Sequence, residues 1–176
     1  PHGPKLRLLP ENLPYEAMMA SVMRQKASNQ LAKGNMVVGI DENALSPVVF
    51  DFNTEPHCYL FGDAGSGKST FLRVIINEIV RSYPDGKAKI FMLDYRRANL
   101  AQIPQSHFDE QATESLDALA EFLKTRIPGQ DVTAEQLRDR SWWTGSEVYV
   151  LVDDYDLVST SRGNPLRALV PYLAQA

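Results

Sequence analysis

Apolar residues recur along this chain at two spacings, one typical of amphipathic helices and the other of short strands. Repeats of i, i+3, i+4 and i+7 predict helices over residues 15–23, 70–80 and 113–127. Runs rich in β-branched and aromatic residues predict strands at 36–40, 48–52, 57–61, 88–94 and 147–152. Because helices alternate with the last three strands, the pattern predicts an α/β fold with a parallel sheet flanked by helices.

The first part of the chain is predicted to be an arm, a helix and a hairpin. Prolines at positions 1, 4, 10 and 14 predict an extended arm or linker over residues 1–14, followed by one folded domain over residues 15–176. The connection at 41–47 is polar and contains a proline, so the strands on either side are expected to pair. Its adjacent carboxylates, Asp41 and Glu42, are interpreted as part of a solvated turn in preference to a metal site.

Capping signals mark two short helices in the second half of the chain. Residues 133–136 match a capping box, and residues 164–173 are expected to form a helix that begins at an Asn-Pro pair. Trp142 and Trp143 lie between them on a predicted loop. One indole is expected in the core, and the other is a candidate interface anchor.

Composition narrows the class of protein. The 176 residues carry a net charge of −4 with a pI near 5.4, so nothing attracts the whole chain to nucleic acid or to an anionic membrane. The single cysteine, Cys58, has no partner for an internal disulfide and is expected to be a small buried apolar residue in a reducing cytosol. No apolar run approaches the ~20 residues of a membrane span. Any work at a membrane is therefore expected to depend on partner subunits.

The most specific motif is a phosphate-binding loop of the Walker A type, G-x-x-x-x-G-K-[S/T], which runs Gly62-Asp63-Ala64-Gly65-Ser66-Gly67-Lys68-Ser69-Thr70. Backbone N–H groups that converge at a helix N-terminus hold a dense anion such as a polyphosphate. The three glycines let the backbone approach the phosphates without a Cβ. Lys68 is expected to contact the β- and γ-phosphates, and Ser69 to offer its hydroxyl to Mg²⁺. All nine residues are candidate phosphate-binding residues.

A second chemical landmark is the apolar strand at 147–152, which ends in Asp153 and Asp154. Opposite a phosphate loop, the first carboxylate is expected to orient Mg²⁺ together with Ser69, and the second to orient the attacking water. The candidate catalytic residues are therefore Lys68, Asp153 and Asp154, and the candidate metal ligands are Ser69 and Asp153.

Another predicted strand also ends in a carboxylate. Asp94 closes the strand at 88–94, at the edge where open α/β sheets place ligand contacts. Arg96 and Arg97 follow almost at once. Their guanidinium groups either face a phosphate or a neighbouring subunit, or are solvated at the surface.

Four segments give the chain a resemblance to the FtsK/SpoIIIE class of P-loop ATPases, and within it to the EccC ATPases of type VII (ESX) secretion. They are Pro56-His57, Gly62 to Ser69, Leu93-Asp94-Tyr95-Arg96-Arg97 and Val152-Asp153-Asp154-Tyr155-Asp156-Leu157-Val158. The likeness runs from about Leu8 to the end, and the segments look like the C-terminal ATPase module of such proteins. The resemblance implies a RecA-like core that binds ATP and Mg²⁺.

The resemblance also implies the wider setting. The module would be one of several in tandem, in the cytosolic arm of a hexameric motor held at the inner face of the cell membrane by partner subunits. Its partners would be other ATPase modules of the same or a partner EccC chain. It would capture secreted helical hairpins of the EsxB type through their C-terminal tails.

Two departures from the family pattern affect these expectations. Asp154 stands where motor members of the wider class usually have Glu. Its carboxylate is one methylene shorter, so ATP binding is expected, while efficient hydrolysis stays an open question. A RecA-like core also has more parallel strands than the three predicted here, so the sheet is expected to be incomplete toward the C-terminus.

Two alternative functions stay open. A DNA-translocating ATPase of the FtsK type would need a basic, salt-sensitive DNA face, which the acidic balance disfavours. A non-hydrolysing structural or regulatory module would use nucleotide only to stiffen the fold and an oligomer interface.

Overall fold

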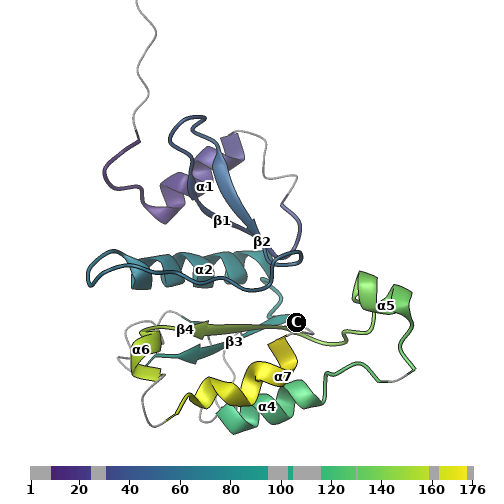
Figure 1. The fold of residues 1–176 in the computed structure, drawn as a ribbon. Coiled ribbons are helices and arrows are strands. Elements are labelled where there is room, and N and C mark those ends of the chain that lie inside the picture. Colours follow the sequence, from purple (N-terminus) through teal and green to yellow (C-terminus); the bar gives the residue numbers. More distant parts are fainter. Residues whose placement is uncertain are drawn as a thin grey trace, which may run out of the picture.

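Helix α2 (Lys68–Ser82) lies in the middle of the fold, between a hairpin layer and a parallel sheet (Figure 1). The structure is a computed structural model that describes residues 9–24, 31–94, 103–104, 116–129, 131–158 and 163–173. On one side of α2 lie the first helix and the hairpin. On the other side lie the sheet and the helices that cover its far face.

The hairpin layer packs an amphipathic helix on a pair of antiparallel strands. Helix α1 (Tyr15–Arg24) buries Met18, Met19 and Val22 against Val37. Strands β1 (Asn35–Ile40) and β2 (Pro47–Asp51) pair in antiparallel register, with an irregularity between Val37 and Gly39. The predicted helix and hairpin are therefore both present. In the connecting turn, the Asp41 carboxylate accepts the N–H of Ala44.

The second layer is a parallel pair of strands whose carboxyl ends share one edge. Strands β3 (Ala88–Leu93) and β4 (Glu147–Val152) pair over their full length, from Ala88 opposite Glu147 to Leu93 opposite Val152. One face packs on α2 through a core that includes Ile75, Ile76, Ile79, Ile90 and Met92. Because parallel strands end at the same edge, the residues after Leu93 and Val152 are brought together.

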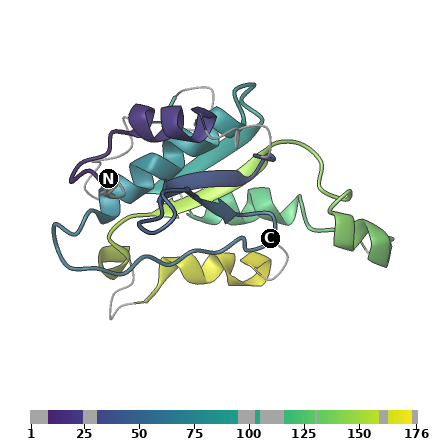
Figure 2. The ribbon, with the colours of Figure 1, turned by 90° about the horizontal axis from the view of Figure 1, so that it is seen from above.

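Helices cover the other face of this sheet, on the side away from α2 (Figure 1); Figure 2 shows the stacked layers from above. Helix α4 (Leu116–Lys124), the 3₁₀ helix η4 (Pro165–Leu169) and helix α7 (Val170–Leu173) lie there, and Leu119 and Leu169 pack on Phe91. Asn164 caps η4 by accepting the N–H of Leu166 at 3.0 Å. The predicted helix at 164–173 is therefore present, with a 3₁₀ first part.

Two further short helices flank β4. In α5 (Ala134–Asp139), the Thr133 hydroxyl accepts the N–H of Gln136, and the Gln136 side chain accepts the N–H of Thr133. The predicted capping box is therefore confirmed. Helix α6 (Tyr155–Val158) follows β4 after the acid pair. Among the helices that the structure describes, none has both the length and the apolar character needed to cross a membrane.

The strand predicted at 57–61 is wrong. These residues are an exposed coil, in which Tyr59 and Phe61 are 78% and 89% exposed and Cys58 is exposed rather than buried. A strand exists only where its backbone groups find a ladder partner, and over the described residues β4 pairs with β3 alone. His57 instead hydrogen-bonds the Leu173 carbonyl at 2.9 Å, which holds the coil beside α7.

Three other boundaries and positions differ from the prediction. Within the described residues, the helix predicted over 113–127 is present as α4. It ends at Lys124, where the chain turns and leaves Ile127 at the surface. Thr113, its predicted cap, lies outside the described residues. Helix α2 begins at Lys68, two residues earlier than predicted. Trp142 and Trp143 are both half-buried, so neither indole is a core residue. The division into an arm at 1–14 and a domain at 15–176 stays a prediction.

Candidate phosphate and metal site

The glycine-rich loop ends where α2 begins, in a backbone conformation that only glycine adopts readily. Gly67 is the N-cap of α2 with φ 94°, in the left-handed region. Gly62 has a different constraint, because a Cβ there would come within 2.5 Å of the Ser66 hydroxyl oxygen. The loop is closed by the N–H of Ser66, which donates to the Asp63 carbonyl at 3.2 Å. Residues 62–67 are all exposed, so an anion has direct access to the helix N-terminus.

The Lys68 ammonium group lies over this loop. It donates to the carbonyl oxygens of Gly62 and Asp63 at 2.7 and 2.8 Å. These bonds hold a positive charge at the mouth of the loop, where backbone donors and the helix dipole also favour negative charge. Lys68 is therefore placed to exchange a carbonyl partner for an anionic oxygen.

Ser69 joins the loop helix to the end of β4. Its hydroxyl donates to Asp153 Oδ2 at 2.8 Å, across a separation of 84 residues. Asp153 is only 4% exposed. Its backbone N–H donates to the Leu93 carbonyl at 2.9 Å, so the β-ladder fixes its position. A hydroxyl and a carboxylate are thus held together beside the loop, and oxygen ligands of this kind suit Mg²⁺.

Asp154 lies one residue beyond the ladder. Its φ is 51°, in the left-handed region that aspartate tolerates better than most residues. Its N–H donates to Asp153 Oδ1 at 3.0 Å. The second acid is therefore adjacent to the first, and its backbone conformation sets the direction of its side chain.

The neighbouring strand places Asp94 at the same edge of the sheet. Asp94 follows Leu93 directly and is 8% exposed, so it is a buried carboxylate next in register to Asp153. This position agrees with the expectation that β3 ends at the ligand edge. Arg96 and Arg97 lie outside the described residues.

A buried acid that the sequence analysis missed positions α2. Glu78 has no exposed surface, and its carboxylate accepts hydrogen bonds from the Tyr15 hydroxyl, the Val37 N–H and the Arg81 guanidinium at 2.6–2.8 Å. Burial, and then the bond to Glu78, raise the pKa of the Tyr15 hydroxyl. The hydrogen bond to Glu78 likewise raises the pKa of Arg81. An acid inside the apolar stripe of α2, between Ile75 and Ile79, was the available signal.

Comparison with known proteins decides the family. A family model described as the FtsK/SpoIIIE family matches residues 17–126, which is more than half of the chain and includes the whole phosphate loop. The chain belongs to the FtsK/SpoIIIE family. The resemblance expected from the sequence is therefore confirmed.

Curated relatives are secretion proteins much longer than this chain. Over its full length the chain is 36% identical to the ESX-4 secretion system protein EccC4 of Mycobacterium tuberculosis and 40% identical to the ESX secretion system protein EccC of Thermomonospora curvata. It spans only 14% and 13% of those proteins. The similarity therefore concerns one segment of each of these relatives.

Solved structures of relatives agree with the fold. Thermomonospora curvata EccC (ATPases 2 and 3) in complex with a signal sequence peptide matches the whole chain with a TM-score of 0.80 and 40% identity, over 31% of that chain. A protein described only as an ATPase matches 96% of the chain with a TM-score of 0.74 and 28% identity, over 68% of its own length. The α/β fold with a parallel sheet is thus confirmed and agrees with a RecA-like core.

Proposed function

We propose that the chain is an ATP- and Mg²⁺-binding ATPase module of a type VII secretion system. The observation that carries this proposal is the 2.8 Å hydrogen bond from the Ser69 hydroxyl to the Asp153 carboxylate. It joins the first turn of the loop helix to the acidic end of the neighbouring sheet, and both groups are oxygen ligands for a hard divalent cation. When bound, Mg²⁺ would neutralise charge on the β- and γ-phosphates.

Each loop residue has a role in this proposal. Residues Gly62 to Thr70 hold the triphosphate with backbone N–H groups at the N-terminus of α2. The Lys68 ammonium turns from the Gly62 and Asp63 carbonyls to phosphate oxygens. Ser69 and Asp153 hold the metal, and Asp154 orients the attacking water.

The position of Asp154 also supports a second candidate function, a nucleotide-binding module that does not turn over. The Asp154 side chain is one methylene shorter than the Glu usual in motor members of the wider class, so it reaches less far toward an attacking water. The backbone of Asp154 is in the left-handed region, with φ 51°. The two functions separate in a steady-state ATPase assay of Asp154→Glu. If Asp154 is the water-orienting base, the longer carboxylate changes the turnover rate. If the module only binds, both proteins stay at background.

The names of the relatives support a role in secretion. They are named as proteins of ESX secretion systems, and one solved relative holds a signal sequence peptide. These names support a place in a secretion system. We further propose, from the resemblance to the EccC ATPases alone, that the module works among other ATPase modules of the same or a partner chain, in a hexamer at the inner face of the cell membrane that exports EsxB-like helical hairpins.

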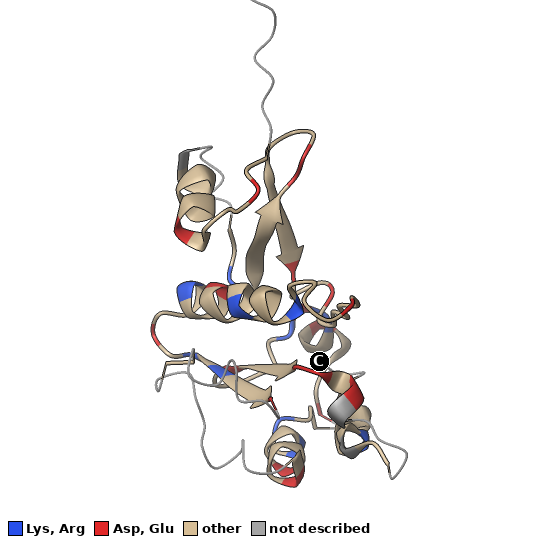
Figure 3. Ribbon diagram, turned by 90° about the vertical axis from the view of Figure 1, so that its left-hand side faces the viewer, with Lys and Arg blue, Asp and Glu red and all other residues tan. Residues whose placement is uncertain are grey.

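Charge distribution argues against the DNA-translocating alternative. The net charge is −4, and Figure 3 shows Lys and Arg spread over several elements that also carry Asp or Glu. Helix α2 carries Lys68, Arg73 and Arg81, and its one acid, Glu78, is buried. A duplex-binding face requires clustered basic side chains, and none of the described helices presents a continuous basic stripe.

Thermal melting with nucleotide tests the proposal. At a hundredfold excess over the dissociation constant, ATP with Mg²⁺ should stabilise the fold by roughly 2.7 kcal/mol. Lys68→Ala should remove most of this shift, because it deletes the charged donor at the loop. Lys87→Ala is the matched control, since Lys87 is an exposed lysine that pairs with Asp85 at 3.3 Å. Equal shifts in Lys68→Ala and the control, or no shift in the wild type, would overturn the proposal.

A further inference from the structure

The phosphate loop contains one side chain whose charge opposes a bound phosphate. Asp63 and Lys68 are the only ionisable side chains of residues 62–70, so the loop has no net formal charge. Residues 62–67 are all exposed. The loop is therefore expected to attract phosphate through its backbone N–H groups and the helix dipole, with no surplus of side-chain charge.

Backbone contacts fix the position of Asp63 in the loop. Its carbonyl accepts hydrogen bonds from the Lys68 ammonium at 2.8 Å and from the Ser66 N–H at 3.2 Å. Standard bond lengths then keep the carboxylate carbon of Asp63 within about 8 Å of the ammonium nitrogen in any rotamer. A negative charge thus lies beside the group that is proposed to contact the β- and γ-phosphates.

The Asp63 carboxylate makes no hydrogen bond or ion pair with any residue that the structure describes. Two other exposed acids, Asp85 and Glu121, by contrast pair with lysines at 3.3 and 3.5 Å. Lys68 bonds the carbonyl of Asp63 and not its carboxylate. The negative charge is therefore not held in an ion pair within this part of the chain, and it acts on an incoming ligand.

The carboxylates at the edge of the sheet have a different place in the site. Asp153 is the proposed metal ligand and Asp154 the proposed water-orienting group, so removing either charge would also change the metal chemistry. Asp63 belongs to the loop and has neither role. Its effect on nucleotide affinity is therefore electrostatic repulsion alone.

We propose that Asp63 makes the site select the Mg²⁺ complex of a nucleoside triphosphate over the free triphosphate, an inference that rests on the proposed function. Mg²⁺ neutralises about half of the negative charge of the triphosphate. Repulsion by a fixed charge is proportional to the charge on which it acts, so the carboxylate penalises the free nucleotide more than its metal complex. The loop then stays available for the form of the nucleotide that carries its metal.

Calorimetric titration at low ionic strength tests this selection, because charges are little screened there. The ligands are ATP with EDTA and ATP with excess Mg²⁺. Asp63→Asn should tighten binding of free ATP about fourfold or more, and binding of the Mg²⁺ complex about twofold. The factor by which Mg²⁺ tightens binding should therefore fall about twofold. Loss of folding cannot imitate a gain in affinity.

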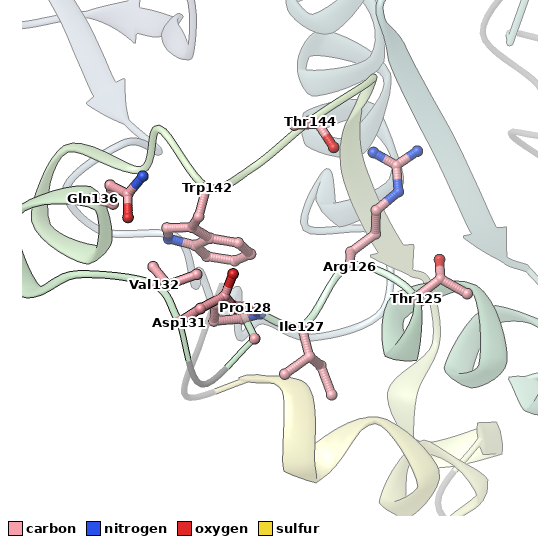
Figure 4. Close-up of a pocket in the computed structure, with 10 residues that line it drawn as sticks. Thr125, Arg126, Ile127, Pro128, Asp131, Val132, Gln136, Trp142 and Thr144 are labelled. Carbon is pink, nitrogen blue, oxygen red and sulfur yellow. The ribbon is translucent and has the colours of Figure 1, made fainter.

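The chain offers a matched control for the change in net charge. Asp131 is exposed and lines a concavity of about 290 Å³ near the amino end of β4, whereas the phosphate loop lies at the carboxyl end. Figure 4 shows Asp131 and Arg126 on opposite sides of this concavity, and no residue of the loop lines it. Asp131→Asn should leave both affinities within about 1.5-fold of the wild type.

A conservative variant separates charge from shape. Asp63→Glu keeps the charge and should keep the factor by which Mg²⁺ tightens binding. Three results for Asp63→Asn would overturn the inference alone: no gain for free ATP, an equal gain for both forms of ATP, or weaker binding of the Mg²⁺ complex, which would make Asp63 a metal ligand. An equal gain in Asp131→Asn would do the same. A wild type that binds neither form would overturn the proposed function and this inference with it.

Discussion

Replacing Glu78 with Gln is expected to destabilise the fold strongly, because this carboxylate ties three elements together. It has no exposed surface and accepts hydrogen bonds from Tyr15 of α1 at 2.6 Å, the Val37 N–H of β1 at 2.7 Å and two Arg81 nitrogens of α2 at 2.8 Å. Arg81 also donates to the Asn35 carbonyl at 3.1 Å. The hairpin layer and the loop helix therefore share one buried ion pair.

The size of the effect follows from burial. Removing one partner of a buried ion pair costs about 3–5 kcal/mol, because the remaining charge is left unpaired. The Arg81 side chain is 28% exposed, so part of its charge stays hydrated. Gln also keeps the volume of Glu and one acceptor oxygen. We therefore expect Glu78→Gln to lower the free energy of unfolding by about 2–3 kcal/mol.

Urea unfolding at neutral pH measures this difference. With a slope of about 2 kcal/mol per molar urea, the midpoint should fall by about 1 M or more. Glu121→Gln is the control, because its side chain is 74% exposed and pairs with Lys124 at 3.5 Å on the surface of α4. That variant should stay within about 0.5 kcal/mol of the wild type. A Glu78→Gln protein as stable as Glu121→Gln would refute the reasoning.

Three further predictions concern single residues. The pKa of Tyr15 is raised from its ordinary 10.0, so its contribution to stability is present below about pH 10 and is lost as the pH rises further. Between about pH 8 and 11, the free energy of unfolding measured in urea should therefore fall less steeply with pH for Tyr15→Phe than for the wild type. The exposed-site control Tyr59→Phe should follow the wild type. Thr133→Ala removes the hydroxyl half of the α5 capping box and should cost about 1 kcal/mol, seen as faster amide exchange in α5. Gly67→Ala places a Cβ at φ 94° and should cost about 1–2 kcal/mol in urea unfolding. An unchanged exchange rate or urea midpoint would contradict the respective prediction.

The local parts of the fold and site could be predicted from the sequence because their physics is local. The capping box at 133–136 needs only residues three apart. The contact between Ser69 and Asp153 joins distant parts of the sequence, yet it could also be predicted. In open α/β sheets the strands end, and the helix after the phosphate loop begins, at the same edge of the sheet.

The features that were missed depend on contacts between residues far apart in the sequence, which the pattern of residue types along the chain does not specify. Residues 57–61 have strand composition, but composition cannot supply the neighbouring strand that a ladder requires. Glu78 interrupts an apolar stripe, and only the structure shows which three donors satisfy it. The position of Arg126 between two aromatic rings depends on the path of the chain from α4 to β4, which no periodicity encodes.

The magnesium dependence of ATP binding tests the central claim most directly. Calorimetric titration of the wild type with ATP should show binding that Mg²⁺ tightens by about tenfold or more. The affinity of Ser69→Ala and Asp153→Asn for ATP should be about that of the wild type without Mg²⁺. Added Mg²⁺ should raise the affinity of these variants only slightly. A wild type that binds no ATP, or variants whose binding Mg²⁺ tightens as much as in the wild type, would contradict the account.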